Sequence, residues 1–319
     1  MKALVFVEHH DGALTPGSLG VLAKAAALGG PVGAVLAGGP GVKELAGDAA
    51  RHGAAVVHVA EDAVLDPPLP QPRVDVLDSV VAAGGYDTVL FSNSVLAGDV
   101  AAGLAARLDA GINWDLVDVV ERDGRLVGVQ PALGDSLLVD VGWRSDVRVG
   151  LFRAGSCEPA ETGGEPTVDD VAVVLRDHSG AAQVVAQTHA VSEGPSLEDA
   201  DVIVAGGIGL GDAEHFALAE DLAALLGGAV GATRAVVYKG WYPHSAQVGQ
   251  TGKTVTPKLY VALGISGAVQ HKVGMQGSKT IVAINKDPNA PIFEFSDLAV
   301  VGDLHVIVPE LIARLRARS

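Results

Sequence analysis

The stretch DVIVAGGIGLGD, residues 201–212, carries the pattern that decides the fold of this chain. Its apolar first half predicts a buried strand that runs into a turn with glycines at 207, 209 and 211. Residues 213–226 predict a helix, for which Asp212 is a suitable cap. The turn reads G-x-G-x-G rather than G-x-G-x-x-G, so by itself it is a weak sign of dinucleotide binding. The start of the helix could still receive a phosphate.

Strand and helix patterns alternate on both sides of this stretch. Downstream, buried strands are predicted at 259–266, 280–286 and 298–303, and a closing helix is predicted with Pro309 in its first turn. Upstream, the first hundred residues predict strands at 3–9, 32–38, 54–60 and 88–94, and helices near 18–29, 42–52, 73–83 and 96–110. This order predicts an α/β fold of two domains, each built on a mainly parallel sheet flanked by helices.

The division between the two domains is expected where hydrophobicity falls and Ser, Gly, Pro and acidic residues gather, near 185–198. The domains would then cover residues 1–190 and 198–319. Short strands and turns over 117–176 predict an antiparallel extension of the first domain.

Composition limits the class of protein. Aromatic residues make up only 4% of the chain, so the cores must be aliphatic. The single cysteine, Cys157, can form no internal disulfide, which favours a reducing, cytoplasmic setting. The N-terminal apolar run is too short for a secretory signal, and glycines and prolines interrupt the uncharged run 25–42, so we expect a protein that is not membrane-embedded.

The charge is unevenly distributed. The chain has a formal net charge of −16, but residues 201–319 hold equal numbers of basic and acidic residues. Within that part, residues 222–286 contain Arg234, six lysines and no aspartate or glutamate, which indicates an anion site or, equally well, a neutral interior edged by solvated lysines. The overall negative field excludes nucleic acid as a partner.

Three polar clusters follow or interrupt the C-terminal strands: GATR (231–234), VGQTGK (248–253) and SGAVQH (266–271). Because ligands in open α/β sheets bind beyond the carboxyl ends of strands, these clusters could converge, although each residue could also be a simple turn former or cap. The G-K-T at 252–254 does not complete a phosphate-binding P-loop, since Gln247 stands where that motif needs glycine. No zinc-site spacing, catalytic triad or activated Cys157 is readable.

In this order, the strings VGQTGK, SGAVQH and INKDPNAPIF (284–293) resemble the alpha subunit of electron-transfer flavoproteins, densely over about the last 120 residues and more weakly in the first domain. The resemblance implies that VGQTGK is a flavin loop. It also implies a Rossmann-like C-terminal domain that binds FAD non-covalently, and an electron-transfer flavoprotein beta subunit that completes a heterodimer through the first domain.

The resemblance further implies a set of FAD-binding residues. Arg234 is expected against the flavin ring, the Thr251 hydroxyl near flavin N5, and His271 near the O2 carbonyl. Asn285 and Asp303 match positions at the adenosine. The full set is Thr233, Arg234, Val248, Gly249, Gln250, Thr251, Ser266, Gly267, Ala268, Val269, Gln270, His271, Asn285, Asp303 and Leu304.

Two positions depart from the family pattern. Ile208 stands where the family has an arginine, and Tyr238 where it usually has an acid. The two changes remove one cation and one anion, so the local field at the flavin could differ while the total charge changes little.

The resemblance implies an electron carrier without its own substrate turnover. It would accept electrons from flavin-dependent dehydrogenases and pass them to a membrane quinone oxidoreductase. One alternative is a divergent or electron-bifurcating paralogue whose second flavin would lie in the beta subunit. Another is a nicotinamide- or adenine-nucleotide-binding enzyme on the same fold, which would need a catalytic acid, base or nucleophile that the sequence does not display.

Overall fold

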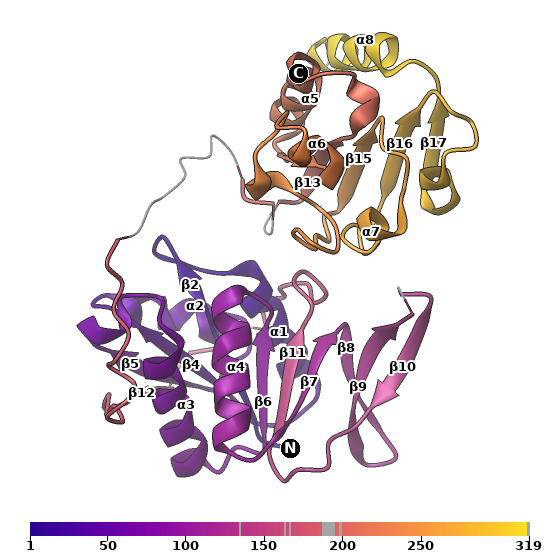
Figure 1. Cartoon of the computed structure of the whole chain (residues 1–319). Helices are drawn as coiled ribbons and strands as arrows, with labels where there is room; N and C mark the ends of the chain where they lie inside the picture. The colour runs from indigo at the N-terminus through magenta and orange to yellow at the C-terminus, as the bar shows by residue number, and fades with distance from the viewer. Residues whose placement is uncertain (134, 163, 166, 187–194, 198–199, 318–319) are drawn as a thin grey trace. The chain divides into compact units, whose positions relative to one another are not determined.

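The computed structural model describes residues 1–317 except 134, 163, 166, 187–194 and 198–199 (Figure 1). It divides into two compact units, Met1–Thr188 and His189–Ser319. The domain limits expected from the sequence stay a prediction, because the boundary near 185–198 falls mostly outside the described residues.

Unit 1 is built on a seven-stranded sheet in which every pair of neighbours is parallel. Its strands, in spatial order, are β12 (Thr167–Asp170), β5 (Val56–Glu61), β4 (Val32–Gly38), β1 (Ala3–Phe6), β6 (Thr88–Ser92), β11 (Arg148–Phe152) and β7 (Gly111–Leu116). Its helices are α1 (Pro16–Ala27), α2 (Ala46–Arg51), α3 (Pro70–Gly84) and α4 (Val95–Arg107).

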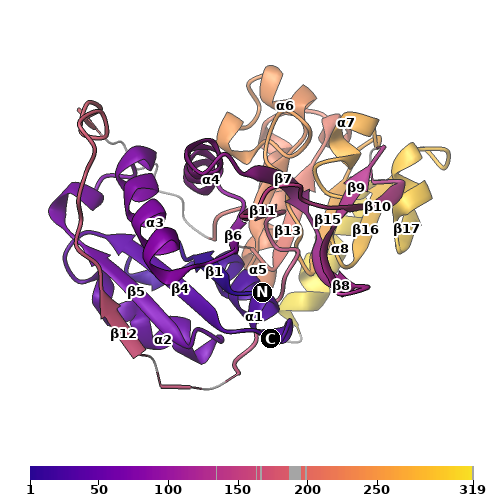
Figure 2. The same cartoon turned by 90° about the horizontal axis from the view of Figure 1, so that it is seen from below.

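Both faces of this sheet are covered by helices. Successive side chains of a strand point to opposite faces, so Leu4 of β1 packs in one cluster with α3 and α4, and Val5 packs in another with α1. Figure 2 shows α3 and α4 on one side of the sheet and α1 and α2 on the other. Burial on both sides explains the unbroken apolar runs of the central strands.

The antiparallel extension is smaller than the sequence indicates. It contains β8 (Asp118–Arg122), β9 (Arg125–Ala132) and β10 (Leu137–Val141), paired in the order β10-β9-β8. Assigning the rest of 117–176 to it is wrong, because β11 lies between β6 and β7 and β12 pairs with β5, all in parallel. These pairings could not be predicted from the sequence, because the paired strands are far apart in the chain. A two-residue hairpin, β2 (His9–His10) and β3 (Ala13–Leu14), completes the unit.

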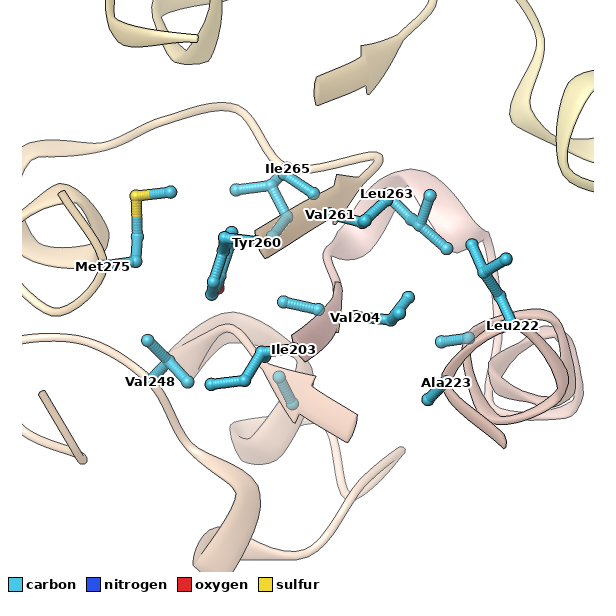
Figure 3. Packing of buried hydrophobic residues seen from close by; sticks show 14 of the residues in the cluster. Ile203, Val204, Leu222, Ala223, Val248, Tyr260, Val261, Leu263, Ile265 and Met275 are labelled. Carbon is cyan, nitrogen blue, oxygen red and sulfur yellow. The ribbon is translucent and has the colours of Figure 1, made fainter. Parts of the chain in front are cut away.

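Unit 2 is built on a five-stranded parallel sheet. In spatial order its strands are β14 (Ala229–Ala232), β13 (Val202–Gly206), β15 (Leu259–Leu263), β16 (Ile281–Asn285) and β17 (Leu298–Val301), and its helices are α5 (Ala217–Leu226), α6 (Arg234–Tyr238), α7 (Val269–Lys272) and α8 (Leu304–Arg316). In Figure 3 the neighbours Ile203 and Val204 point to opposite faces, toward Val248 and Met275 on one side and toward Leu222 of α5 on the other. Both units confirm the predicted α/β class.

The strand order places a crevice in unit 2. β14 lies on one side of β13 while β15 and the later strands lie on the other, so the chain leaves the carboxyl ends of β13 and β15 in opposite directions. Gln247 adds a parallel bridge to Ala232 at the end of β14, which extends that side of the sheet by one residue. The VGQTGK loop therefore starts beside the crevice.

Two helix starts differ from the prediction. α8 begins at Leu304, so Pro309 lies inside the helix rather than in its first turn, and Asp303 caps the helix by accepting a bond from the His305 N–H at 2.9 Å. α5 begins at Ala217, after a short 3-10 turn in which Asp212 accepts from the His215 N–H at 3.0 Å. A side-chain cap marks the start of α8, whereas Phe216, the residue before α5, makes no such bond, and apolar periodicity alone locates neither start.

Candidate functional site

A cavity of about 690 Å³ opens at the carboxyl ends of β13, β14, β15 and β16. Loops that follow all four strands contribute to its wall, together with the loop after Gln247. It is lined by Gly207, Ile208, Gly209, Thr233, Arg234, Ala235, Tyr238, Gln247, Val248, Gly249, Gln250, Thr251, Gly264, Ile265, Ser266, Ala268, Gln270, His271, Asn285, Asp287, Ala290 and Pro291. The three polar clusters of the sequence do converge.

Another cavity, of about 560 Å³, lies in unit 1 beside the β8–β9 turn. Two of its lining charges already pair with each other, since Arg148 Nη1 lies 3.2 Å from Asp87 Oδ1. None of its lining residues belongs to the clusters that the sequence singled out, so the cavity of unit 2 is the candidate site.

Glycines let the backbones of two turns touch at the crevice. A Cβ on Gly207 would lie 2.3 Å from the Gly264 carbonyl oxygen, and a Cβ on Gly264 would lie 2.7 Å from Gly209 Cα. The Gly207 N–H donates to Leu263 O and the Gly209 N–H to Gly264 O, both at 2.9 Å. Gly207 and Gly209 are thus needed for packing of the turn after β13 on the turn after β15.

The VGQTGK loop is held in shape by its own backbone. Lys253 N–H donates to Gln247 O at 2.7 Å, and Gly249 N–H donates to Lys253 O at 3.1 Å. Gln250 N–H donates to Gln270 O at 2.7 Å, which ties the loop to the start of α7. A side chain at Gly249, where φ is +138°, would meet Gln270 O at 2.8 Å, so only glycine suits this contact.

Gln247 is buried beneath this loop, with 1% of its surface exposed. Its Nε2 donates to Thr251 Oγ1 at 3.0 Å, while its Oε1 has no partner among the described residues. From the sequence, Gln247 indicates only that the loop is not a P-loop, and it is not predicted as a site residue. Its side chain lies in the cavity wall because the loop closes over it, and no local sequence pattern predicts this closure.

His271 is buried in the cavity wall with both ring nitrogens engaged. Nδ1 lies 3.0 Å from Val248 O, and Nε2 lies 3.0 Å from Tyr260 Oη. A carbonyl oxygen can only accept, so Nδ1 carries the proton and Nε2 accepts from the tyrosine hydroxyl. Burial lowers the pKa of His271 to about 4, against a smaller upward effect of the bond to Val248 O. The imidazole is therefore neutral at neutral pH.

Arg234 supplies the positive charge of the cavity. Among the lining residues that the structure describes, it is the one arginine or lysine, and Asp287 is the one acid. Its Nη2 donates to Tyr238 Oη at 3.0 Å, and its guanidinium lies 4.7 Å from the centre of the Tyr238 ring. Ile208 lines the same cavity. Arg234 thus keeps its charge unneutralised by any carboxylate in the described part of the chain.

Comparison with known proteins identifies the family. Residues 196–276 match the electron transfer flavoprotein FAD-binding domain, and residues 3–176 match the electron transfer flavoprotein domain. The chain belongs to the electron transfer flavoprotein alpha subunit family. It is 44% identical over 322 residues to the electron transfer flavoprotein subunit alpha of Mycobacterium leprae (strain TN), covering 100% of this chain and 99% of that one.

Two further relatives carry the same name. Identity is 44% over 319 residues to the subunit alpha of Mycobacterium tuberculosis (strain ATCC 25618 / H37Rv), with 100% of this chain and 99% of the relative covered. It is 39% over 327 residues to the mitochondrial subunit alpha of Oryza sativa subsp. indica, with 99% and 90% covered. The C-terminal unit is thus an FAD-binding domain of this family, as the resemblance implied.

The family residues expected from the sequence fall into two groups. Most line the cavity: Thr233, Arg234, Val248, Gly249, Gln250, Thr251, Ser266, Ala268, Gln270, His271 and Asn285. Four do not: Gly267, whose backbone packs on Ile292; Val269, which is exposed; Asp303, which caps α8; and Leu304, which is buried. Their roles toward FAD stay predictions. For His271, both ring nitrogens already bond within the chain.

The residues present fit an FAD group. The cavity lies within the range of ~300–1,000 Å³ usual for ligand sites. Arg234 suits an anion, and the unpaired Gln247 oxygen requires a donor. Flavin nucleotides offer both anionic phosphates and hydroxyl donors. The described residues contain no group of three or more His, Cys, Asp or Glu placed to hold a metal, and no helix long and apolar enough to cross a membrane.

Proposed function

We propose that this chain is the alpha subunit of a heterodimeric electron carrier, which holds FAD in the cavity of unit 2 and is completed by a beta subunit. It would take electrons from flavin-dependent dehydrogenases and deliver them to a membrane quinone oxidoreductase. The observation that carries the proposal is the convergence of the VGQTGK loop, the His271 segment and Arg234 on one cavity of an FAD-binding domain.

FAD would supply reversible one-electron and two-electron chemistry. The protein would supply position and charge. The loop 247–253, closed by its backbone bonds, would hold Thr251 as a hydroxyl donor toward flavin N5. Arg234 would favour negative charge on the ring or the pyrophosphate by Coulomb attraction. Asn285, whose Nδ2 donates to Ile265 O at 2.8 Å, would fix the loop after β15 toward the adenosine.

The state of His271 supports a carrier over a nicotinamide-dependent enzyme. A general acid or base must be free to exchange a proton at the operating pH. The His271 imidazole is buried, hydrogen-bonded at both nitrogens and neutral, with a pKa of about 4. Its one proton is bonded to Val248 O and its other nitrogen accepts from Tyr260 Oη, so neither nitrogen is free to exchange a proton with a substrate. This histidine is suited to holding the shape of the cavity wall.

Substitution of Arg234 tests the site. The chain is co-produced with its beta subunit, and the reduction potential of the flavin is measured by spectroelectrochemical titration. Arg234→Ala should lower the potential of the first electron by up to ~40 mV, since an exposed charge pair contributes up to ~1 kcal/mol. Lys239→Ala is the matched control, because Lys239 follows α6 directly but does not line the cavity. Equal shifts in both variants would argue against a flavin beside Arg234.

Two observations test the wider proposal. A yellow one-to-one complex with the beta subunit is expected, with flavin absorbance. A colourless protein that retains NAD instead would support the nucleotide-binding enzyme. A single chain that binds FAD tightly and exchanges electrons with a dehydrogenase on its own would refute the heterodimer.

A further inference from the structure

Gln247 occupies a position that its own loop enforces. Its N–H donates to His244 O at 3.0 Å, and its carbonyl accepts from the Lys253 N–H at 2.7 Å. A side chain at Gly252 would lie 2.3 Å from this carbonyl, so the turn closes tightly over it. The side chain is consequently directed inward, where it forms part of the cavity wall and is 1% exposed.

The amide of Gln247 determines which way the Thr251 hydroxyl can act. Because Gln247 Nε2 donates to Thr251 Oγ1 at 3.0 Å, one lone pair of that oxygen is occupied and its single proton is free to be donated elsewhere. Both residues line the cavity. The Thr251 hydroxyl can therefore donate its proton to a ligand in the cavity, because it accepts from Gln247 and does not donate to it.

The other end of the same amide lacks a partner. Gln247 Oε1 is buried and accepts no hydrogen bond from the described residues. An unpaired buried carbonyl oxygen destabilises a fold unless a ligand or water completes it. An amide of the cavity wall that has one end bonded to Thr251 and the other end buried without a partner is suited to receive an O–H or N–H donor. The ribityl hydroxyls and the ring N3–H of a flavin are donors of this kind.

We propose that Gln247 is a further cofactor-binding residue: its Nε2 orients the Thr251 hydroxyl as a donor toward the flavin, and its Oε1 accepts a hydrogen bond from an O–H or N–H group of the FAD. This inference rests on the proposed function. It assigns Gln247 two separable roles, one exerted through Thr251 on the reduced flavin and one exerted directly on the cofactor in either redox state.

A double-mutant cycle separates the two roles. Gln247→Met keeps the size of the side chain and removes both polar ends, while Thr251→Val keeps the shape of threonine and removes the hydroxyl. The affinity of the complex for oxidised FAD is measured by fluorescence titration. The preference for reduced over oxidised flavin is measured from the reduction potential.

Gln247→Met should weaken the binding of oxidised FAD about tenfold, or about 1.4 kcal/mol, in both the wild-type and the Thr251→Val backgrounds. It should also lower the preference for reduced flavin severalfold in the wild-type background, and leave that preference unchanged once Thr251 is valine. Gln276→Met, in the same unit but outside the cavity wall, is the control and should change neither quantity.

Gln247→Glu provides a second test should the methionine variant fold poorly. A carboxylate only accepts, so it would draw the Thr251 proton toward residue 247 and reduce the preference for reduced flavin further. An effect of Gln247→Met that is the same in both backgrounds would overturn the action through Thr251, and unchanged affinity for oxidised FAD would overturn the direct contact. Wild-type protein that takes up no FAD would overturn the proposed function itself.

Discussion

The buried imidazole of His271 should make the stability of unit 2 depend on pH. Its Nδ1 proton is bonded to Val248 O and its Nε2 accepts from Tyr260 Oη, so a second proton would face the tyrosine hydroxyl without a counter-charge. Burial lowers the pKa of the ring from 6.5 to about 4 in the folded chain. In the unfolded chain, the ring titrates near its ordinary value.

The size and sign of the effect follow from these two values. Between the folded pKa of about 4 and the unfolded value of 6.5, the unfolded chain binds more protons than the folded chain. The contribution of His271 to the free energy of unfolding therefore falls as the pH is lowered through this window, and this contribution is constant above and below it. At ~1.4 kcal/mol for each pKa unit, the loss amounts to about 3 kcal/mol.

Trp241 allows this loss to be measured in unit 2 alone. The chain has three tryptophans, and Trp241 is the one that packs against the core of unit 2. Replacing Trp114 and Trp143 by Phe leaves its fluorescence as a local reporter of urea unfolding. The unfolding free energies of the wild type and of His271→Gln are then compared from about pH 7 to about pH 4. Glutamine can donate and accept but does not titrate there.

The test uses the difference in unfolding free energy between the wild type and His271→Gln at each pH, because the contributions of all other titrating groups cancel in this difference. The wild type should lose about 3 kcal/mol relative to His271→Gln over this range. His244→Gln, which changes an exposed imidazole of the same unit, should retain the full pH dependence of the wild type. A wild type that runs parallel to His271→Gln at every pH would refute the buried, neutral state of His271.

Two further predictions concern the stability of the fold. Gly207→Ala should destabilise unit 2 by ~1–3 kcal/mol in urea unfolding, because the new Cβ would lie 2.3 Å from Gly264 O. Gly47→Ala, in helix α2 of unit 1 with open space around it, should leave the stability of unit 1 unchanged or raise it, and a similar loss for both substitutions would contradict the packing argument. Asp303→Ala should cost about 1 kcal/mol by removing the cap that accepts from the His305 N–H, whereas Asp303→Asn should be nearly silent, and a silent alanine variant would show that the cap contributes nothing.

Much of the fold could be predicted because the strands carry their signal locally. β4 covers Val32–Gly38, the full apolar run at 32–38, and it is buried at every position. A parallel strand covered by helices on both faces must be apolar at successive residues, so the run itself marks the strand. Prediction failed where the pairing of a strand depends on residues that are remote in the chain. The sequence predicts an antiparallel sheet for the segment that forms β11, whereas β11 pairs in parallel with β6 and β7, whose residues are remote in the chain.

In the cavity too, some features follow from the order of the elements along the chain and others from single contacts. The sequence placed Arg234, Thr251, Ser266 and Asn285 after strands or in loops, and parallel strands end at one edge, so their convergence followed from the order of elements. By contrast, α8 starts five residues before Pro309, because Asp303 caps it with a single side-chain bond.

By itself, the sequence determined the α/β class, the family and most of its predicted site residues that line one cavity, because strand periodicity and loop motifs are recognised from residues adjacent in the chain. Only the tertiary structure decided the protonation of His271 and the role open to Gln247. Tyr260 bonds to His271 from a different element, and Gln247 is buried in the cavity wall because the loop through Lys253 closes over it. Burial and hydrogen-bond partners depend on which segments meet in space, and the order of residues along the chain does not specify this.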